Sequence, residues 1–214
     1  MFDSRTSVLP VVIDTVIPAG MLGPDPVPSD VRCFLVPHNA GVLLVDTGIP
    51  GSEQALGAAL SDIGACWADV TDVVLSHCHF DHTGGLPKVL AAAPDALVWA
   101  GAADISSIDT GGPAVSALRD GDRIRTLTVV ATPGHTAGHV SLLDEAAALL
   151  LVGDLVGVMH GAVVRAPAAF TVDAVTAEDS LRRIAALELS RVLFSHGAER
   201  DDGPAVVKAL VDLR

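Results

Sequence analysis

The sequence predicts an α/β protein in which a β-sandwich is flanked by helices. Strand-type and helix-type segments alternate along the 214 residues, which favours a mixed architecture. Twenty glycines and thirteen prolines indicate many short elements separated by turns. Half of the residues are hydrophobic but only 3% are aromatic and none is tyrosine, so we expect a core of Ala, Val, Leu and Ile. The length suits a single domain over residues 1–214.

The first half of the chain predicts a hairpin followed by alternating helices and strands. Residues 19–30, AGMLGPDPVPSD, are typical of a loop. Two apolar runs, 32–36 and 41–48, flank the turn-type segment PHNA and predict the hairpin. In 52–64 apolar residues recur at helical spacing. The remaining expectations are a buried strand at 71–76, a helix at 85–93 and a strand at 96–100.

The second half predicts further strands and two helices. Residues 102–118 suit a helical or irregular segment. Residues 176–187 are apolar on one face and carry Arg182 and Arg183 on the other, as in an amphipathic helix. The other expected elements are strands at 122–134, 139–144, 148–154 and 191–197, and a closing helix at 204–213.

The segment HCHFDH, directly after the expected strand at 71–76, concentrates metal-ligand side chains. In an extended loop, residues two apart point the same way, so His77 and His79 can grip one cation together. Asp81 and His82 can then face a second cation, and imidazole and carboxylate groups suit zinc. By the same alternation Cys78 points away, and we expect it to pack.

Three more ligand-type residues lie at the ends of expected strands. His135 is in ATPGHTAGH, Asp154 in LLLVGDL and His196 in VLFSHG. A lone carboxylate after so apolar a strand as that before Asp154 is expensive to bury without a counter-charge. Singly, each of the three suits an ordinary polar residue at a strand end. Taken with HCHFDH, they complete a ligand set.

These motifs, in this order, resemble those of the metallo-β-lactamase-fold hydrolase superfamily, over essentially the whole chain from VDTG to SHG. The resemblance implies an αββα four-layer sandwich of two mixed sheets flanked by helices. It also implies which residues bind which ion: His77, His79 and His135 the first, Asp81, His82 and His196 the second, and Asp154 both. Asp46 of VDTG resembles a position that braces the metal loop.

The implied activity is hydrolysis at a dinuclear site with two zinc ions per chain, although manganese or iron stays open. Two ions about 3.5–4 Å apart share a water, and the resulting hydroxide attacks a small ester, lactone or thioester. Asp81, His82 and Asp154 are the expected catalytic residues. HFDHTGG and TPGHTAGH resemble the lactonases, but many of these use a pocket tyrosine. Hydroxyacylglutathione hydrolases add a C-terminal helical region, whereas eighteen residues follow His196 here.

Two alternatives remain. An iron-dependent persulfide dioxygenase of the same fold binds one iron through two histidines and an aspartate, which match His79, His135 and Asp154. That reading leaves His82 and His196 without a metal role. A metal-binding domain without catalysis is the other alternative, and the complete ligand set argues against it.

The remaining histidines and one loop carry weaker expectations. We expect His139 to be structural, His38 to lie in a turn and His160 to reach the mouth of a pocket. Met21 and Leu22 lie in a flexible-looking segment and are candidates for covering that pocket.

Charge and cysteine content limit the partners. The net charge is −13 with no cluster of Lys or Arg, so we expect a small-molecule substrate and no nucleic acid. Three cysteines without a CxxC pair favour a reducing compartment. Neither a secretory signal nor an uninterrupted apolar run of about 20 residues is present, so we expect a cytoplasmic protein that does not enter a membrane. A homodimer stays open.

Overall fold

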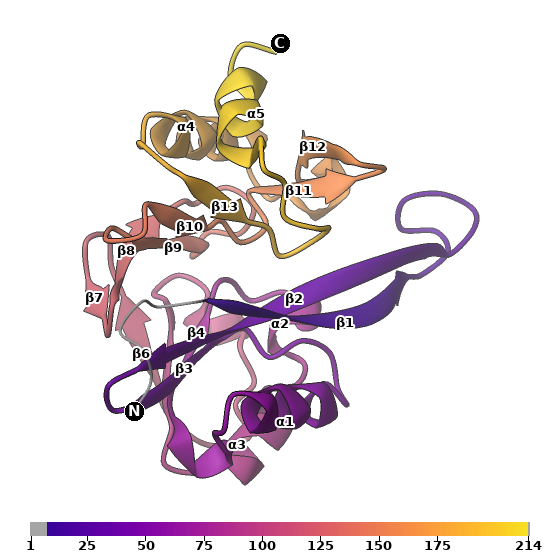
Figure 1. The fold of residues 1–214 in the computed structure, drawn as a ribbon. Coiled ribbons are helices and arrows are strands. Elements are labelled where there is room, and N and C mark those ends of the chain that lie inside the picture. Colours follow the sequence, from indigo (N-terminus) through magenta and orange to yellow (C-terminus); the bar gives the residue numbers. More distant parts are fainter. Residues whose placement is uncertain (1–7, 214) are drawn as a thin grey trace. The chain divides into compact units, whose positions relative to one another are not determined.

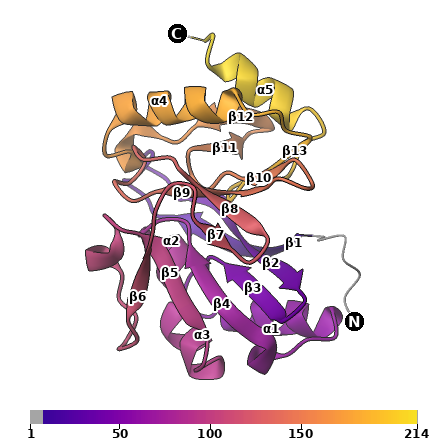
Figure 2. The same cartoon turned by 90° about the vertical axis from the view of Figure 1, so that its left-hand side faces the viewer.

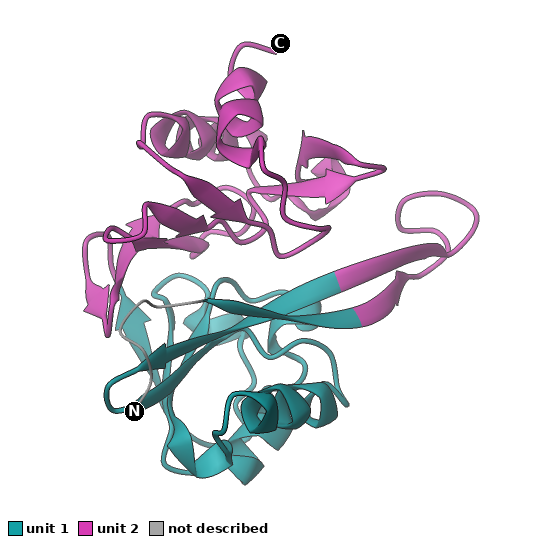
Figure 3. Cartoon of the chain, in the orientation of Figure 1, with its two compact units in different colours: residues 1–13, 31–118 teal, residues 14–30, 119–214 magenta. Residues whose placement is uncertain are grey.

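The computed structural model describes residues 8–213, and within it the chain divides into two compact units (Figure 1 and Figure 3). Unit 1 comprises residues 1–13 and 31–118, and unit 2 comprises residues 14–30 and 119–214. Residues 1–7 and residue 214 lie outside the described residues. A secretory signal would begin within residues 1–7, so its expected absence stays a prediction. The expectation of a single domain over 1–214 stays a prediction.

Unit 1 is built on a mixed sheet with the strand order β1-β2-β3-β4-β5-β6. Its strands are β1 (Leu9–Ile17), β2 (Val27–His38), β3 (Gly41–Val45), β4 (Val70–Leu75), β5 (Leu97–Gly101) and β6 (Val115–Leu118). The connected ends of β1 and β2, residues 14–17 and 27–30, belong to unit 2 (Figure 3). β2 and β3 form the expected antiparallel hairpin, with Phe34 opposite Val45. From β3 to β6 the strands are parallel, so each connection must cross over.

The crossovers of unit 1 contain helices. They are α1 (Glu53–Asp62), α2 (Phe80–Thr83), α3 (Leu86–Ala92) and two 3-10 turns at Trp67–Asp69 and Ile105–Ser107. Leu56 and Leu60 of α1 and Leu86 and Val89 of α3 are fully buried against the strands. Figure 2 shows both helices on one face of this sheet. The helical periodicity in 52–64 is thereby confirmed, because it places the apolar residues on the buried side.

Unit 2 contains a second mixed sheet with the order β13-β10-β9-β8-β7. Its strands are β7 (Arg123–Ile124), β8 (Leu127–Ala131), β9 (Val140–Asp144), β10 (Leu149–Leu151) and β13 (Arg191–Leu193). Neighbours are antiparallel except β10 and β13. Because β8 and β10 are both antiparallel to β9, the strands β8, β10 and β13 all run in the same direction.

Helices α4 (Ala174–Ala185) and α5 (Gly203–Leu210) pack on the sheet of unit 2 (Figure 2). Asp173 caps α4 by accepting hydrogen bonds from the backbone N–H groups of Val175 and Thr176. Leu181 and Ile184 are buried on the face that the sequence marks as apolar. The fold class predicted from the sequence, two mixed sheets each with flanking helices, is confirmed.

Several elements differ from the sequence-based expectations. The Pro-containing residues 9–17 form β1, because an edge strand tolerates a proline that cannot donate to the ladder. Residues 27–30, expected in a loop, begin β2, and β6 lies within the segment expected to be helical or irregular. A hairpin of β11 (Val156–Met159) and β12 (Ala162–Arg165) follows Asp154, and Phe80–Thr83 is a helical turn rather than extended.

No helix within residues 8–213 is long and apolar enough to span a bilayer.

Candidate metal centre

In unit 1, four ligand-type side chains follow the buried strand β4. His77 and His82 are fully buried, whereas His79 and Asp81 are partly exposed. β4 ends at Leu75, and the chain bends through residues 76–79 before α2 begins at Phe80. The bend and the helical turn bring His82 back toward the end of the strand, so that its ring lies 4.0 Å from that of His77, centroid to centroid.

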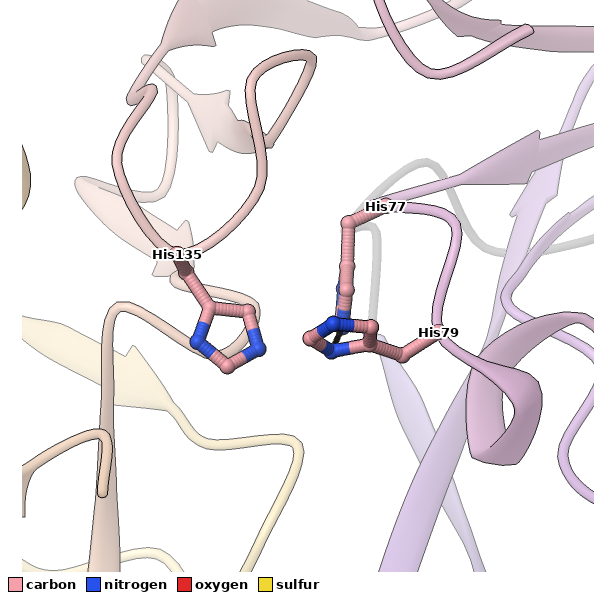
Figure 4. A group of neighbouring side chains, drawn as sticks. All are labelled: His77, His79 and His135. Carbon is pink, nitrogen blue, oxygen red and sulfur yellow. Dashed lines mark hydrogen bonds between the residues drawn. The ribbon is translucent and has the colours of Figure 1, made fainter. Parts of the chain in front are cut away.

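The imidazoles of His77 and His79 lie side by side. His77 Nε2 is 3.0 Å from His79 Nδ1, and the rings are edge to face with their centroids 4.7 Å apart (Figure 4). The two side chains converge from the bend at residues 76–78 and not from an extended loop, so alternation along a strand is not what brings them together. Two imidazole nitrogens at this separation offer neighbouring lone pairs, which is what a shared cation requires.

Asp46 braces this group from the end of β3. Its buried carboxylate accepts hydrogen bonds from the Ser76 backbone N–H at 2.7 Å and the Ser76 hydroxyl at 2.8 Å. His82 Nδ1 lies 2.9 Å from the same carboxylate and donates to it. Because Nδ1 is engaged there, the His82 ring presents Nε2 as its ligand nitrogen. The role that the resemblance implies for Asp46 agrees with these contacts.

The neighbouring Cys78 has surroundings of its own within unit 1. Its backbone N–H donates to Asp104 at 3.0 Å, and its side chain is half-buried. Burial and, after it, the Asp104 carboxylate raise the pKa of the Cys78 thiol to about 11. Cys78 is therefore a thiol at neutral pH, which agrees with the packing role expected from the sequence.

In unit 2, three ligand-type side chains gather where parallel strand ends meet. His135 follows β8, Asp154 follows β10 and His196 follows β13. Asp154 Oδ2 lies 3.0 Å from His196 Nε2 and 3.6 Å from His135 Nε2. His135 is buried, and the Asp154 side chain is 11% exposed. A carboxylate oxygen this near two imidazole nitrogens can bind a metal ion together with either histidine.

Backbone contacts orient the histidines of unit 2. His196 Nδ1 donates to the Asp30 carbonyl at 2.5 Å, and the backbone N–H of Gly197 donates to the Asp30 carboxylate at 3.1 Å. These bonds turn Nε2 of His196 toward Asp154. The carbonyl of His135 accepts a bond from the backbone N–H of Val172 at 3.1 Å, which holds the turn that carries His135.

The structure also places the three histidines that are not predicted ligands. His38 is the last residue of β2 rather than a turn residue, and its Nε2 lies 3.1 Å from the Thr71 hydroxyl. His160 is exposed, and with Gly161 it forms the turn between β11 and β12, at φ values of 49° and 78°. His139 is buried and structural, as expected. Met21 is 49% exposed, and its contact with a substrate stays a prediction.

The seven predicted ligands are thus gathered in two groups, four in unit 1 and three in unit 2. Within each group, neighbouring ligand atoms lie 3.0–3.8 Å apart in pairs: His77 with His79 and Asp81 with His82 in unit 1, and Asp154 with His135 and with His196 in unit 2. Their union in one dinuclear centre stays a prediction.

The family model of the metallo-beta-lactamase superfamily matches residues 26–196. The chain belongs to this superfamily. The matched range contains Asp46 and all seven predicted ligands.

Two curated relatives of the chain carry names of hydrolases. The thioesterase pkgB of Emericella nidulans is 32% identical over 170 residues, which are 77% of this chain and 45% of that protein. A hydroxyacylglutathione hydrolase of Methylobacterium sp. is 35% identical over 136 residues, 58% of this chain and 51% of that protein. The chain therefore spans about half the length of these curated relatives.

Two solved structures share the fold. A metallo-beta-lactamase family protein of Thermus thermophilus matches with a TM-score of 0.72 at 22% identity, over 97% of this chain and 78% of that one. A protein solved in a di-iron-bound form matches with a TM-score of 0.67 at 26% identity, over 81% of this chain and 91% of that one.

Proposed function

We propose that the protein is a metal-dependent hydrolase acting on a small ester, thioester or lactone. The observation that carries the proposal is the position of the Asp154 carboxylate beside both His135 and His196 in unit 2. The relatives named a thioesterase and a hydroxyacylglutathione hydrolase support hydrolysis of an acyl group and favour the thioester.

The donor chemistry fits two transition-metal ions. We assign His77, His79 and His135 to one ion, Asp81, His82 and His196 to the other, and Asp154 to both. When bound, such a pair supplies a water acidic enough to attack at neutral pH and polarises the substrate carbonyl. Imidazole and carboxylate groups suit zinc, and the relative with a di-iron-bound form keeps iron open.

The side chains divide the remaining tasks. Asp46 and Ser76 hold the ring of His82 so that Nε2 points away from Asp46 and toward Asp81. Asp81 Oδ2 lies 3.8 Å from His82 Nε2, and its side chain is 36% exposed, so it is placed to take a proton from water and pass it to the leaving group. Asp154 lies within 3.6 Å of both histidines of unit 2 and is the proposed ligand of both ions. Asp81, His82 and Asp154 are therefore the proposed catalytic residues.

Elemental analysis combined with a substrate panel tests the proposal. We expect about two zinc-like ions per chain after purification without chelator, and turnover of p-nitrophenyl esters, lactones or acyl thioesters. One iron per chain with thiol-dependent oxygen uptake would instead establish the persulfide dioxygenase. Bound metal without turnover of any of these compounds would leave a metal-binding domain.

Replacing the carboxylate of Asp154 is a sharper test. In Asp154→Asn we expect loss of at least one ion per chain and a fall in kcat of about a hundredfold or more, because the amide is a poor metal ligand. Asp144→Asn is the matched control, since Asp144 is a buried carboxylate of the same unit whose contacts are the N–H groups of Ala146 and Ala147. Full metal content and activity in Asp154→Asn would exclude Asp154 as a ligand.

Partners and location stay predictions. The free cysteines Cys33, Cys66 and Cys78 are compatible with the proposed cytoplasmic location. We retain a small-molecule substrate as the proposed partner, and light scattering will decide between monomer and homodimer.

A further inference from the structure

His139 is a buried histidine that lies behind the proposed ligands of unit 2 rather than among them. It is 1% exposed and immediately precedes β9. Its Nε2 accepts a hydrogen bond from the backbone N–H of Asp154, with the two nitrogens 2.9 Å apart. On the other side of the ring, Nδ1 lies 2.8 Å from the Thr132 hydroxyl and 3.1 Å from the Thr132 carbonyl.

These contacts define the state of the ring. An amide N–H can only donate, so Nε2 of His139 must carry a lone pair toward Asp154. The proton of the neutral imidazole is then on Nδ1, where the carbonyl and hydroxyl oxygens of Thr132 can accept it. Both ring nitrogens are used within the protein, so His139 is not itself a metal ligand.

His139 joins two ligand-bearing segments that are distant along the chain. Thr132 and His139 close the turn that carries His135, because the backbone N–H of Thr132 also donates to the carbonyl of His139 at 3.0 Å. From this turn the ring reaches the segment after β10. A second route runs from the Thr132 hydroxyl to Ser141 Oγ at 3.0 Å, and from there to the carbonyl of Val152 at 2.9 Å.

Gly153 shows how closely the second segment approaches the ring. Its φ is +63°, a conformation that disfavours other residues. A Cβ atom at this position would lie only 2.5 Å from His139 Nε2. The backbone at 153 therefore turns the N–H of Asp154 toward the imidazole and leaves room for nothing larger than hydrogen beside it.

We propose that His139 is a positioning residue that sets the separation of His135 and Asp154 through the Asp154 backbone. An apolar side chain of similar volume would fill the space but would leave the Asp154 N–H without its acceptor, and the carboxylate would lose its fixed direction. Where a metal ligand is held by such an outer partner, removing that partner typically weakens metal binding or activity about 10–100-fold. The inference rests on the proposed function in that it takes His135 and Asp154 as ligands.

The test compares three variants, with and without metal. His139→Leu removes the acceptor, and His139→Gln restores an acceptor oxygen near the position of Nε2. His38→Leu is the matched control, because His38 is also buried and also lies between a threonine hydroxyl and a backbone N–H, those of Thr71 and Ala40, but in unit 1. Thermal unfolding of all three shows how much each substitution destabilises the fold.

The first readout uses metal-free protein. By NMR we expect the Asp154 amide to exchange with solvent at least about tenfold faster in His139→Leu than in the wild type, and the ring signals of His196 and His135 to shift. In His38→Leu neither should change. Unchanged Asp154 exchange in His139→Leu would overturn the inference, whatever the protein does with metal.

The second readout is the dissociation constant for Zn²⁺, measured by competition with a chromophoric chelator. We expect about a 10–100-fold weakening in His139→Leu, recovery of most of it in His139→Gln, and no change in His38→Leu. Equal weakening of Zn²⁺ binding in His139→Leu and His38→Leu would show that His139 contributes only to the stability of the fold, and would overturn the inference. A wild-type protein that binds no Zn²⁺ or other divalent ion would overturn the proposed function instead. If His139→Leu does not fold, the test uses His139→Gln. Its Zn²⁺ affinity and its Asp154 amide exchange rate should then lie between those of the wild type and those expected for His139→Leu. Values outside that range would overturn the inference.

Discussion

At the scale of single residues, Asp46 combines an unusual backbone conformation with a demanding set of partners. Its φ of +60° lies in the left-handed region, which Asp and Asn adopt more readily than other non-glycine residues. That conformation turns the carboxylate back onto the segment after β4, where Ser76 and His82 donate to it. Aspartate is thus favoured at this position both by the backbone conformation and by the hydrogen bonds that its carboxylate accepts.

Two substitutions of Asp46 test how much these requirements contribute to stability. We expect Asp46→Ala to lower the free energy of unfolding by about 3 kcal/mol, because three buried donors lose a charged acceptor. Asp46→Asn keeps the left-handed conformation and one acceptor oxygen, so we expect a loss of about 1–2 kcal/mol. Urea denaturation of metal-free protein measures both. Equal losses in the two variants would show that neither the left-handed conformation nor the remaining acceptor oxygen contributes to stability.

The buried Cys33 gives a prediction about thiol chemistry. Burial and, after it, the charge of Asp46 raise the pKa of the Cys33 thiol well above its usual value. The thiolate is the reactive form, so Cys33 should not react with a disulfide reagent at pH 8 until the protein unfolds. Cys66 is exposed and should react in the folded state. In Cys66→Ser the fast phase should disappear, and its persistence would contradict the assignment.

At the scale of elements, α1 and α4 could be predicted because their apolar residues recur at helical spacing and meet a buried face. The strands β1 and β6 and the hairpin β11–β12 could not be predicted with the same rules. In β1, Pro10 resembles an interruption and is tolerated only because the strand lies at the sheet edge. In β11–β12 the signal was the pair His160-Gly161, a two-residue turn with positive φ at both positions.

Part of the arrangement of the candidate site could be predicted from the sequence. Ligand-type side chains that directly follow apolar strands are expected to lie close together, because strands that run in the same direction end at the same edge of a sheet. His135, Asp154 and His196 follow this rule in unit 2. Asp81 and His82 lie on a helical turn, and their roles as metal ligands stay predictions. The contact of His139 with the Asp154 backbone depends on a left-handed Gly153, and no pattern in the sequence indicates that proximity.

The ion pair between β12 and α4 predicts a pH dependence. Arg165 Nε lies 2.8 Å from the carboxylate of Glu178, and its guanidinium also donates to the carbonyls of Leu210 and Leu213 near the end of α5. The hydrogen bond from Arg165 holds the pKa of the Glu178 carboxyl below its usual value. A lowered pKa in the folded state stabilises the protein above the unfolded-state pKa, and that stability is lost as the pH falls through the folded-state pKa.

We therefore expect Glu178→Gln to lower the free energy of unfolding by about 0.5–1 kcal/mol at pH 7, with the difference from wild type vanishing in acid. Chemical denaturation across a pH series measures it. Glu188→Gln is the control, because Glu188 is 94% exposed beside Lys208 and should have a smaller effect. A difference that grows toward low pH would contradict the sign of the shift.

At the scale of the whole molecule, metal binding should appear as stability. A ligand that binds only the folded state stabilises it by about 2.7 kcal/mol at a hundredfold excess over Kd. For a chain of about this length each kcal/mol shifts Tm by about 2–4 °C. We expect Zn²⁺ at that excess to raise Tm by about 5–10 °C, and a chelator to reverse it. Scanning calorimetry should show a smaller rise in Asp154→Asn, and an equal rise would place the ion elsewhere.

The close approach of Gly134 to the first turn of α4 restricts how this chain can diverge. A Cβ atom at 134 would lie 2.2 Å from the backbone nitrogen of Ala177, and the Gly134 carbonyl accepts a bond from the N–H of Asp173. The turn that carries His135 and the start of the helix are therefore in backbone contact. In a saturation library of position 134, we expect only glycine among the clones that fold. In a library of insertions between residues 171 and 176, we expect no insertion among the clones that fold.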